Sequence, residues 1–123
     1  MLYIKKRWII LLNEYSQLQI LRNIKEDVSQ PSIAKEIGFS VGKVNFIIKA
    51  LVEKGLVKSE RFLASNNRMK YSYLLTEDGV KEKMTLTKKF INIKKAEYEE
   101  LQKELRADSA EFSQKKSIDI IKA

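Results

Sequence analysis

The stretch EIGFSVGKVNFIIKAL, residues 36–51, decides the fold because it contains the end of one helix, a turn and the start of the next. It holds two of the chain's four glycines. Gly38 can adopt the left-handed conformation that ends a helix, Phe39 can turn inward, and Ser40 is a good N-cap for the segment that follows. The stretch therefore predicts two helices joined by a tight turn.

The two helices are bounded by recognisable capping residues. Ser29 is a suitable N-cap and Pro31 falls in the first turn, where its missing N–H is harmless, so the first helix is predicted to run to Ile37. The second is predicted to run from Ser40 to Gly55, another glycine suited to end a helix. Its apolar residues recur at helical spacing and form the expected buried face: Val44, Ile47, Ile48 and Leu51.

Gly42 lies where the second helix begins, although glycine in a helix costs about 1 kcal/mol relative to alanine. One explanation is that the missing Cβ lets the helix N-terminus approach a phosphate or a base edge. The other is that it permits tight packing against the preceding helix. The sequence leaves both explanations open.

The flanking segments show two different hydrophobic periods. Residues 2–24 have helical spacing, as one long helix or two joined near Ser16. After Gly55 the period changes to two on both sides of a polar turn, which predicts a β-hairpin over residues 56–75. Thr76 then caps a helix predicted to continue to about Leu105, and the weakly patterned remainder is expected to be a tail or a short helix.

This order of elements predicts a mainly α fold with a small β-hairpin, namely a winged helix-turn-helix flanked by N- and C-terminal helices. The expected organisation is an extra N-terminal helix at residues 1–15, a winged helix-turn-helix DNA-binding domain at 16–75, a C-terminal dimerisation helix at 76–106, and a tail or short helix at 107–123.

Composition argues against catalysis. The chain has no cysteine and no histidine, which removes thiol nucleophiles, disulfides and imidazole bases, and it shows no glycine-rich phosphate loop. We expect no enzyme activity, no cofactor and no metal site. The apolar run at residues 8–12 is too short for the core of a signal peptide, and no segment is long enough to span a bilayer. A cytoplasmic protein with no membrane partner is therefore expected.

The net charge of +8 is unevenly distributed. Residues 1–76 contain 13 lysines and arginines against 6 acidic residues, whereas residues 77–123 contain 11 against 10. A basic excess confined to the predicted winged domain favours a polyanionic partner, and nucleic acid before a membrane surface.

Two runs of sequence resemble a known family. VSQPSIAKEIGFSVGKVNFIIKALVEKGLVK at 28–58 and LLTEDGVKEKMTLTKKFINIKKAEYEELQKEL at 74–105 are similar to the MarR-type, exopolysaccharide-associated transcriptional regulators, with GKVN at 42–45 and AEYE at 96–99 as the specific features. The resemblance covers about residues 16–105. Residues 1–15 and those after Arg106 depart from it.

The resemblance implies a regulator of exopolysaccharide genes that binds a palindromic site on double-stranded DNA as a homodimer, with any small-molecule effector unknown. A winged-helix protein-interaction module and a non-specific RNA-binding protein are the alternatives. The interaction module would be favoured if the second helix of the helix-turn-helix, the recognition helix, were neutral, or if the β-hairpin, the wing, were uncharged. Here both segments are basic and carry side-chain amides that can read bases.

The residues expected to contact DNA come from three places. Asn45 can pair with adenine, Lys43 with guanine or a phosphate, and Phe46 can cover a thymine methyl or pack on the wing instead. Wing arginines can enter a narrow minor groove, although a solvated basic loop is the alternative. The predicted set is Ser29, Gln30, Ser40, Val41, Gly42, Lys43, Asn45, Phe46, Lys49, Arg61, Asn66, Asn67, Arg68 and Lys70.

The C-terminal helix carries an apolar seam with an interval of seven residues, which is typical of helix pairing. The seam consists of Met84, Ile91, Tyr98, Leu105 and Phe112, with Leu101 in a partial second row. In the expected dimer, the seam packs on the partner's N-terminal helix through Trp8, Leu11, Leu12 and Tyr15. The alternative is that it packs within its own subunit.

Overall fold

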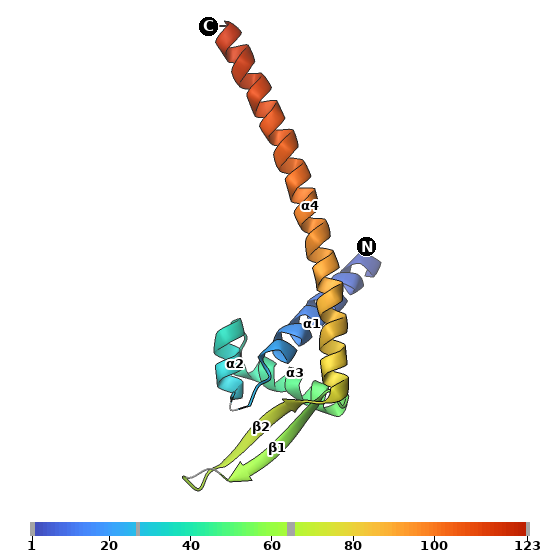
Figure 1. The fold of residues 1–123 in the computed structure, drawn as a ribbon, viewed down its shortest axis with the longest axis vertical. Coiled ribbons are helices and arrows are strands. Elements are labelled where there is room, and N and C mark those ends of the chain that lie inside the picture. Colours follow the sequence, from blue (N-terminus) through green and yellow to red (C-terminus); the bar gives the residue numbers. More distant parts are fainter. Residues whose placement is uncertain (1, 27, 64–65, 123) are drawn as a thin grey trace. The chain divides into compact units, whose positions relative to one another are not determined.

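The computed structural model describes the backbone of residues 2–26, 28–63 and 66–122, and the side chains of residues 13–26, 28–63 and 66–117. The elements follow the predicted order (Figure 1). They are α1 (Leu2–Asn23), α2 (Gln30–Ile37), α3 (Val41–Glu53), β1 (Val57–Leu63), β2 (Met69–Leu75) and α4 (Glu77–Lys122). The predicted mainly α fold with a small β-hairpin is confirmed.

The core lies where α1, α2 and α3 meet. The four residues predicted for the inner face of α3 are all buried, at 9% exposure or less. They are joined by Leu18, Ile20, Leu21 and Ile24 from α1, by Ile33 and Ala34 from α2, and by Val57 at the start of β1. Burial of apolar side chains, at about 25 cal/mol per Å², is the main force that holds the three helices together.

The turn between α2 and α3 has the predicted geometry. Gly38 adopts φ +76°, and the N–H groups of Gly38 and Phe39 both donate to the carbonyl of Ala34. Ser40 is the N-cap of α3, because its Oγ accepts from the N–H of Lys43 at 3.1 Å. The turn therefore supplies a hydrogen-bond partner at each of the two helix ends and sets the direction in which α3 leaves α2.

The wing is an antiparallel pair of strands in which Val57 faces Leu75 and Leu63 faces Met69. Val57 is the only buried residue of β1 among its described positions. The hairpin extends away from the helices (Figure 1), so most of its side chains reach solvent.

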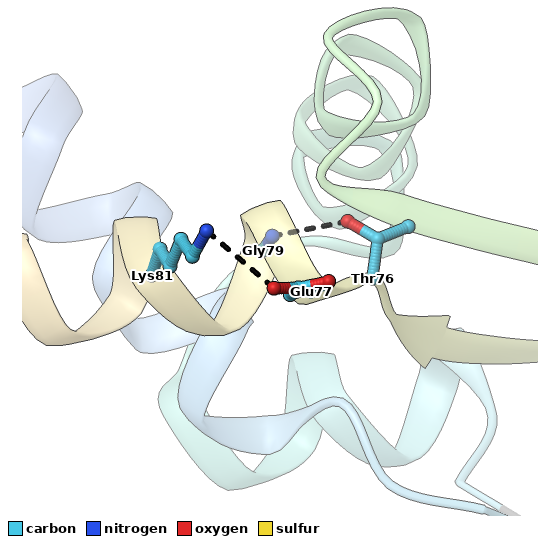
Figure 2. A network of polar contacts seen from close by, with 4 residues as sticks. All are labelled: Thr76, Glu77, Gly79 and Lys81. Carbon is cyan, nitrogen blue, oxygen red and sulfur yellow. Dashed lines mark hydrogen bonds and ion pairs between the residues drawn. The ribbon is translucent and has the colours of Figure 1, made fainter.

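The wing and α4 are joined by a compact junction (Figure 2). Thr76 Oγ1 accepts from the N–H of Gly79 at 3.0 Å, as Figure 2 shows. The same hydroxyl donates to the carbonyl of Gly55 at 2.7 Å. The N–H of Thr76 donates to the carbonyl of Leu56 at 3.1 Å. An ion pair between Lys81 and Glu77 at 3.5 Å lies on the exposed side of the same turn. Thr76 thus fastens α4 to the end of α3, a role that its predicted capping function does not include.

α1 is one helix that runs through Ser16, so of the two arrangements expected for residues 2–24 the single long helix is the one found. One detail of the helices differs from expectation. α4 does not end near Leu105 but continues to Lys122, so the expected tail is part of this helix. The reason is that no glycine or proline follows Gly79, so the added stretch contains neither of the two residue types that strongly disfavour a helix.

The chain divides into two compact units, Met1–Lys88 and a second one that begins at Lys89. The first contains the core and the wing, and the second is the remaining part of α4. Within the described residues, none of the helices has the length and apolar character needed to cross a membrane.

Candidate nucleic-acid interface

The outward face of α3 opens to solvent around Gly42. This residue is exposed, and a Cβ built on it would have no atom within 4 Å beyond its own helix. Its φ lies outside the left-handed region, so the backbone does not require glycine. The packing explanation for Gly42 is therefore wrong, and close approach of an external partner is the explanation that remains.

Phe46 is the most exposed large apolar side chain among the described residues, at 75%. It follows Gly42 by one helical turn, on the same face of α3. The alternative in which Phe46 packs on the wing is wrong. Its ring is available to a partner, and covering it would be favourable because burial removes apolar surface from water.

Lys43 and Lys49 lie on either side of this face, and both are exposed. The Nζ of Lys43 lies 3.9 Å from the centre of the Phe39 ring, a cation–π contact across the helix-turn-helix turn. Phe39, which was expected to turn inward, is thus half-buried, and its ring contacts Lys43 at the start of α3.

Asn45 belongs to a polar network that the sequence did not predict. Gln30 Nε2 donates to Asn45 Oδ1 at 3.2 Å and to the hydroxyl of Tyr73 at 2.9 Å. The contacts join the first residue of α2, the middle of α3 and strand β2. Gln30 was expected to hold a phosphate, but both of its side-chain N–H groups are directed at protein atoms.

The two serines of the predicted set cap helices. Ser29 Oγ accepts from the N–H of Ser32 at 3.2 Å, as Ser40 does at the start of α3. Both are exposed. At each helix start, backbone N–H groups without an intrahelical partner lie at the positive end of the helix dipole, where anions bind favourably.

The wing brings its cations together on one ribbon. Arg61 faces Tyr71 across the hairpin, with the guanidinium 5.8 Å from the ring centre, and Lys70 faces Phe62. Near the tip, Asn67 has a φ of 60° and Asn66 Oδ1 accepts from the N–H of Arg68 at 3.4 Å. The wing members of the predicted set are all exposed: Arg61, Asn66, Asn67, Arg68 and Lys70.

A groove of about 1270 Å³ separates the start of α2, the side of α3 and the wing. Asn45, Lys49, Lys70 and Tyr73 contribute to its lining. Tyr73 also lines this groove, although the predicted DNA-binding set does not include it. Strand alternation placed it on one face of the hairpin, but gave no sign of a partner in α2.

Electrostatically, the site consists of unpaired positive charges. The ion pair within the wing joins Lys58 to Glu60 at 3.1 Å. Over the described residues, no ion pair neutralises the cations of α3 and the wing that were predicted to contact DNA: Lys43, Lys49, Arg61, Arg68 and Lys70. Their charge is available to an anion.

The predicted seam of α4 is exposed along its length, from 54% at Met84 to 67% at Phe112, and Ile91, Tyr98, Leu101 and Leu105 lie between these values. Of the residues expected to meet it, Tyr15 is half-buried, whereas the side chains of Trp8, Leu11 and Leu12 lie outside the described residues.

Comparisons with known proteins agree with this architecture. Residues 14–58 match a family model described as winged helix-turn-helix DNA-binding. A search of curated protein sequences finds no significant match.

Similar solved structures come from Staphylococcus aureus. One is MarR in complex with salicylate and kanamycin, with 18% identity, a TM-score of 0.54, and coverage of 78% of this chain and 69% of that one. Another is MepR, a transcription regulator of the multidrug efflux pump MepA, with 18% identity, a TM-score of 0.51, and coverage of 81% and 74%. A MepR mutant bound to an oligodeoxyribonucleotide has 20% identity, a TM-score of 0.50, and coverage of 81% and 75%. At these identities the likeness concerns the fold, and the chain has a MarR-like winged helix-turn-helix fold.

Proposed function

We propose that the chain binds duplex DNA in a sequence-specific manner and regulates transcription without catalysing a reaction. The observation that carries this proposal is the bare outward face of α3, where Gly42 has open space and Phe46 is 75% exposed, beside unpaired cations. The match of residues 14–58 to a DNA-binding winged helix-turn-helix model supports it. So does the oligodeoxyribonucleotide bound by the similar MepR mutant.

In the proposed complex, α3 enters the major groove with its N-terminal half at the base edges. Asn45 pairs with a base, Phe46 covers a thymine methyl and Lys43 reaches a guanine or a phosphate. The open space at Gly42 allows the helix backbone to approach the DNA closely. The residues that contribute to phosphate contacts are Ser29, Ser40, Val41 and Lys49.

The wing is proposed to reach the adjacent minor groove. Arg61 and Arg68 are exposed on the ribbon and can enter a narrow, electronegative groove, while Lys70 and the tip asparagines contact the backbone. Cations that form no ion pair within the described residues suit this role, since neutralising phosphates releases condensed counterions.

The assembly is proposed to be a homodimer on a palindromic operator, with one α3 per half-site. The exposed seam of α4 supports pairing with a second copy. The sequence resemblance to exopolysaccharide-associated regulators supports control of exopolysaccharide genes.

A protein-interaction module is the second candidate, and the exposed apolar residues of the wing favour it: Phe62, Leu63, Met69 and Tyr71. A protein partner buries such surface, whereas DNA contacts are mostly polar. The two candidates differ in how salt affects the binding affinity, which falls steeply with salt for DNA and little for a partner that covers apolar surface.

The experiment starts with selection of binding sites from random duplex DNA, followed by titration on the selected and on a random duplex. If the dimer makes about six phosphate contacts or more, raising salt from 50 to 200 mM weakens binding by roughly a thousandfold. A flat salt dependence, or no enriched sequence, contradicts the proposal and favours the protein-interaction module.

Two matched variants separate contacts to the DNA bases from contacts to the DNA backbone. We expect Asn45→Ala to lose about 1–3 kcal/mol on the selected site and little on random DNA, because a base contact is sequence-dependent. Lys49→Ala should weaken both complexes about equally and reduce the salt slope by about one. Equal losses on both duplexes for Asn45→Ala would show that it reads no base.

A further inference from the structure

Gln30 is placed between two elements that both line the proposed DNA-binding groove. Its Nε2 carries two hydrogens, and the structure directs one at Asn45 Oδ1 (3.2 Å) and the other at the Tyr73 hydroxyl (2.9 Å). Gln30 itself is half-buried, so the contacts are partly shielded from water. Tyr73, on β2, thereby positions the Gln30 side chain that contacts Asn45 on α3.

This contact has a consequence for the chemistry of Asn45. A side-chain amide has an acceptor end and a donor end, and it can present either one by turning over. The Gln30 N–H group favours the orientation in which Oδ1 lies next to Gln30. The Nδ2 end, with two hydrogens, is then left for a ligand.

We propose that Gln30, held by Tyr73, is a positioning residue that fixes the orientation of the Asn45 amide and so determines which base the recognition helix selects. This inference rests on the proposed function, since it assigns a specificity mechanism to the same site. It replaces the phosphate contact expected of the Gln30 side chain.

The hydrogen-bonding groups on the base edges determine which bases each orientation of the Asn45 amide can select. A donor at the outward end of Asn45 matches purine N7, guanine O6 or thymine O4, whereas an acceptor there matches cytosine N4 or adenine N6. Turning the amide over therefore changes the preferred base at one position. It leaves the phosphate contacts of the rest of the interface unchanged.

Gln30→Glu tests this by reversing the polarity of the network at nearly constant shape. A carboxylate only accepts hydrogen bonds, so Glu at this position accepts from the Tyr73 hydroxyl and from Asn45 Nδ2. Asn45 must turn over to make that contact. The expected result of binding-site selection is a changed base at a single position, with the ratio of affinities for the two bases shifted by about tenfold to a hundredfold.

The added negative charge also weakens DNA binding in general, and Ser32→Glu controls for it. Ser32 lies on the same first turn of α2 and contacts Ser29 rather than Asn45. A glutamate at this position is compatible with the helix start, because Ser29 and a glutamate three residues later form a capping box. This variant should lose affinity on all sequences and keep the wild-type base preference. Tyr73→Phe, which removes one contact of Gln30, should reduce discrimination at the same single position.

A merely structural role for Gln30 is tested in the Asn45→Ala background. If Gln30 acts through Asn45, Gln30→Glu no longer changes the base preference once Asn45 is removed. A change that persists without Asn45, or an unchanged preference in the single variant, overturns the inference.

Side-chain amide NMR of the free protein separates this inference from the proposed function. The Asn45 NH₂ signals should move downfield in Gln30→Glu but not in Ser32→Glu, because only the former gives Nδ2 a carboxylate partner. Absence of that shift overturns the positioning mechanism even if DNA is bound. If the shift occurs and the wild-type protein binds no duplex DNA, the proposed function fails instead, and the specificity role fails with it.

Discussion

Gly42 and Gly79 both lie in the first turn of a helix, yet a methyl group added to them would meet opposite surroundings. At Gly42 it would lie in open space, whereas at Gly79 it would collide with the backbone carbonyl of Leu56. The roles of Gly38 and Gly55 follow from the sequence, because each comes directly after an apolar helical pattern and adopts φ +76°. The role of Gly79 does not follow from the sequence, because glycine is required there by the carbonyl of Leu56, which lies 23 positions earlier in the chain.

Gly42→Ala is expected to stabilise the fold and weaken DNA binding. Alanine gains up to about 1 kcal/mol over glycine in a helix, and no protein atom opposes the new methyl group. The same methyl group keeps the start of α3 away from the DNA. Thermal unfolding and DNA titration measure the two effects. A stabilised variant with unchanged affinity would show that the DNA does not approach α3 at this residue.

Gly79→Ala is expected to destabilise the protein by about 1–3 kcal/mol, the range for overpacking a buried site. The Leu56 carbonyl cannot move aside easily, because it accepts the N–H of Thr76 at 3.1 Å. Chemical denaturation measures the change, with Gly42→Ala as the control for the same substitution in another first helical turn. Equal stability of the two variants would contradict the tight junction.

At the scale of elements, the capping residues account for how well the sequence predicted the fold. Ser29, Ser40 and Thr76 each precede a helix, and each accepts a backbone N–H three residues later. Such signals are local, so one sequence reveals them. The network of Gln30, Asn45 and Tyr73 spans 43 positions and depends on the distance between α2 and the wing. Periodicity contains no information about that distance.

The junction of wing and α4 gives a prediction at this scale. Thr76→Val keeps the shape of the side chain but removes the hydroxyl that binds Gly55 and Gly79, so it should lose about 1–2 kcal/mol of stability. Thr76→Ser keeps both hydrogen bonds and serves as the matched control. Denaturant unfolding of the two variants measures the difference, and equal stability would contradict the capping role.

At the scale of the whole molecule, the two units differ in charge and in surface. The basic excess of 13 against 6 lies in residues 1–76, which contain the proposed DNA contacts. The second unit is nearly balanced in charge and carries the exposed seam residues from Ile91 to Phe112, whereas Met84 belongs to the first unit. An apolar seam on a charged helix in water favours pairing with another apolar surface. This difference is consistent with the proposal that the seam of α4 serves assembly and that the first unit contacts DNA.

Ile91→Lys combined with Leu105→Lys should give a folded monomer that binds a palindrome poorly. The core around Ile33, Val44 and Leu51 contains neither residue, so the helical content measured by circular dichroism should stay close to that of the wild type. A monomer contacts one half-site at a time, which removes most of the affinity for a palindromic duplex.

The matched control is Asn92→Lys combined with Ser113→Lys, which adds the same charge at exposed positions one residue beyond the seam. Analytical ultracentrifugation should find this control dimeric, because a lysine outside the seam stays in water when two helices pair. In the seam variant the lysines would be buried at the interface, and an unpaired buried charge opposes association strongly. A seam variant that remains dimeric with unchanged DNA affinity would show that the second copy binds elsewhere on the chain.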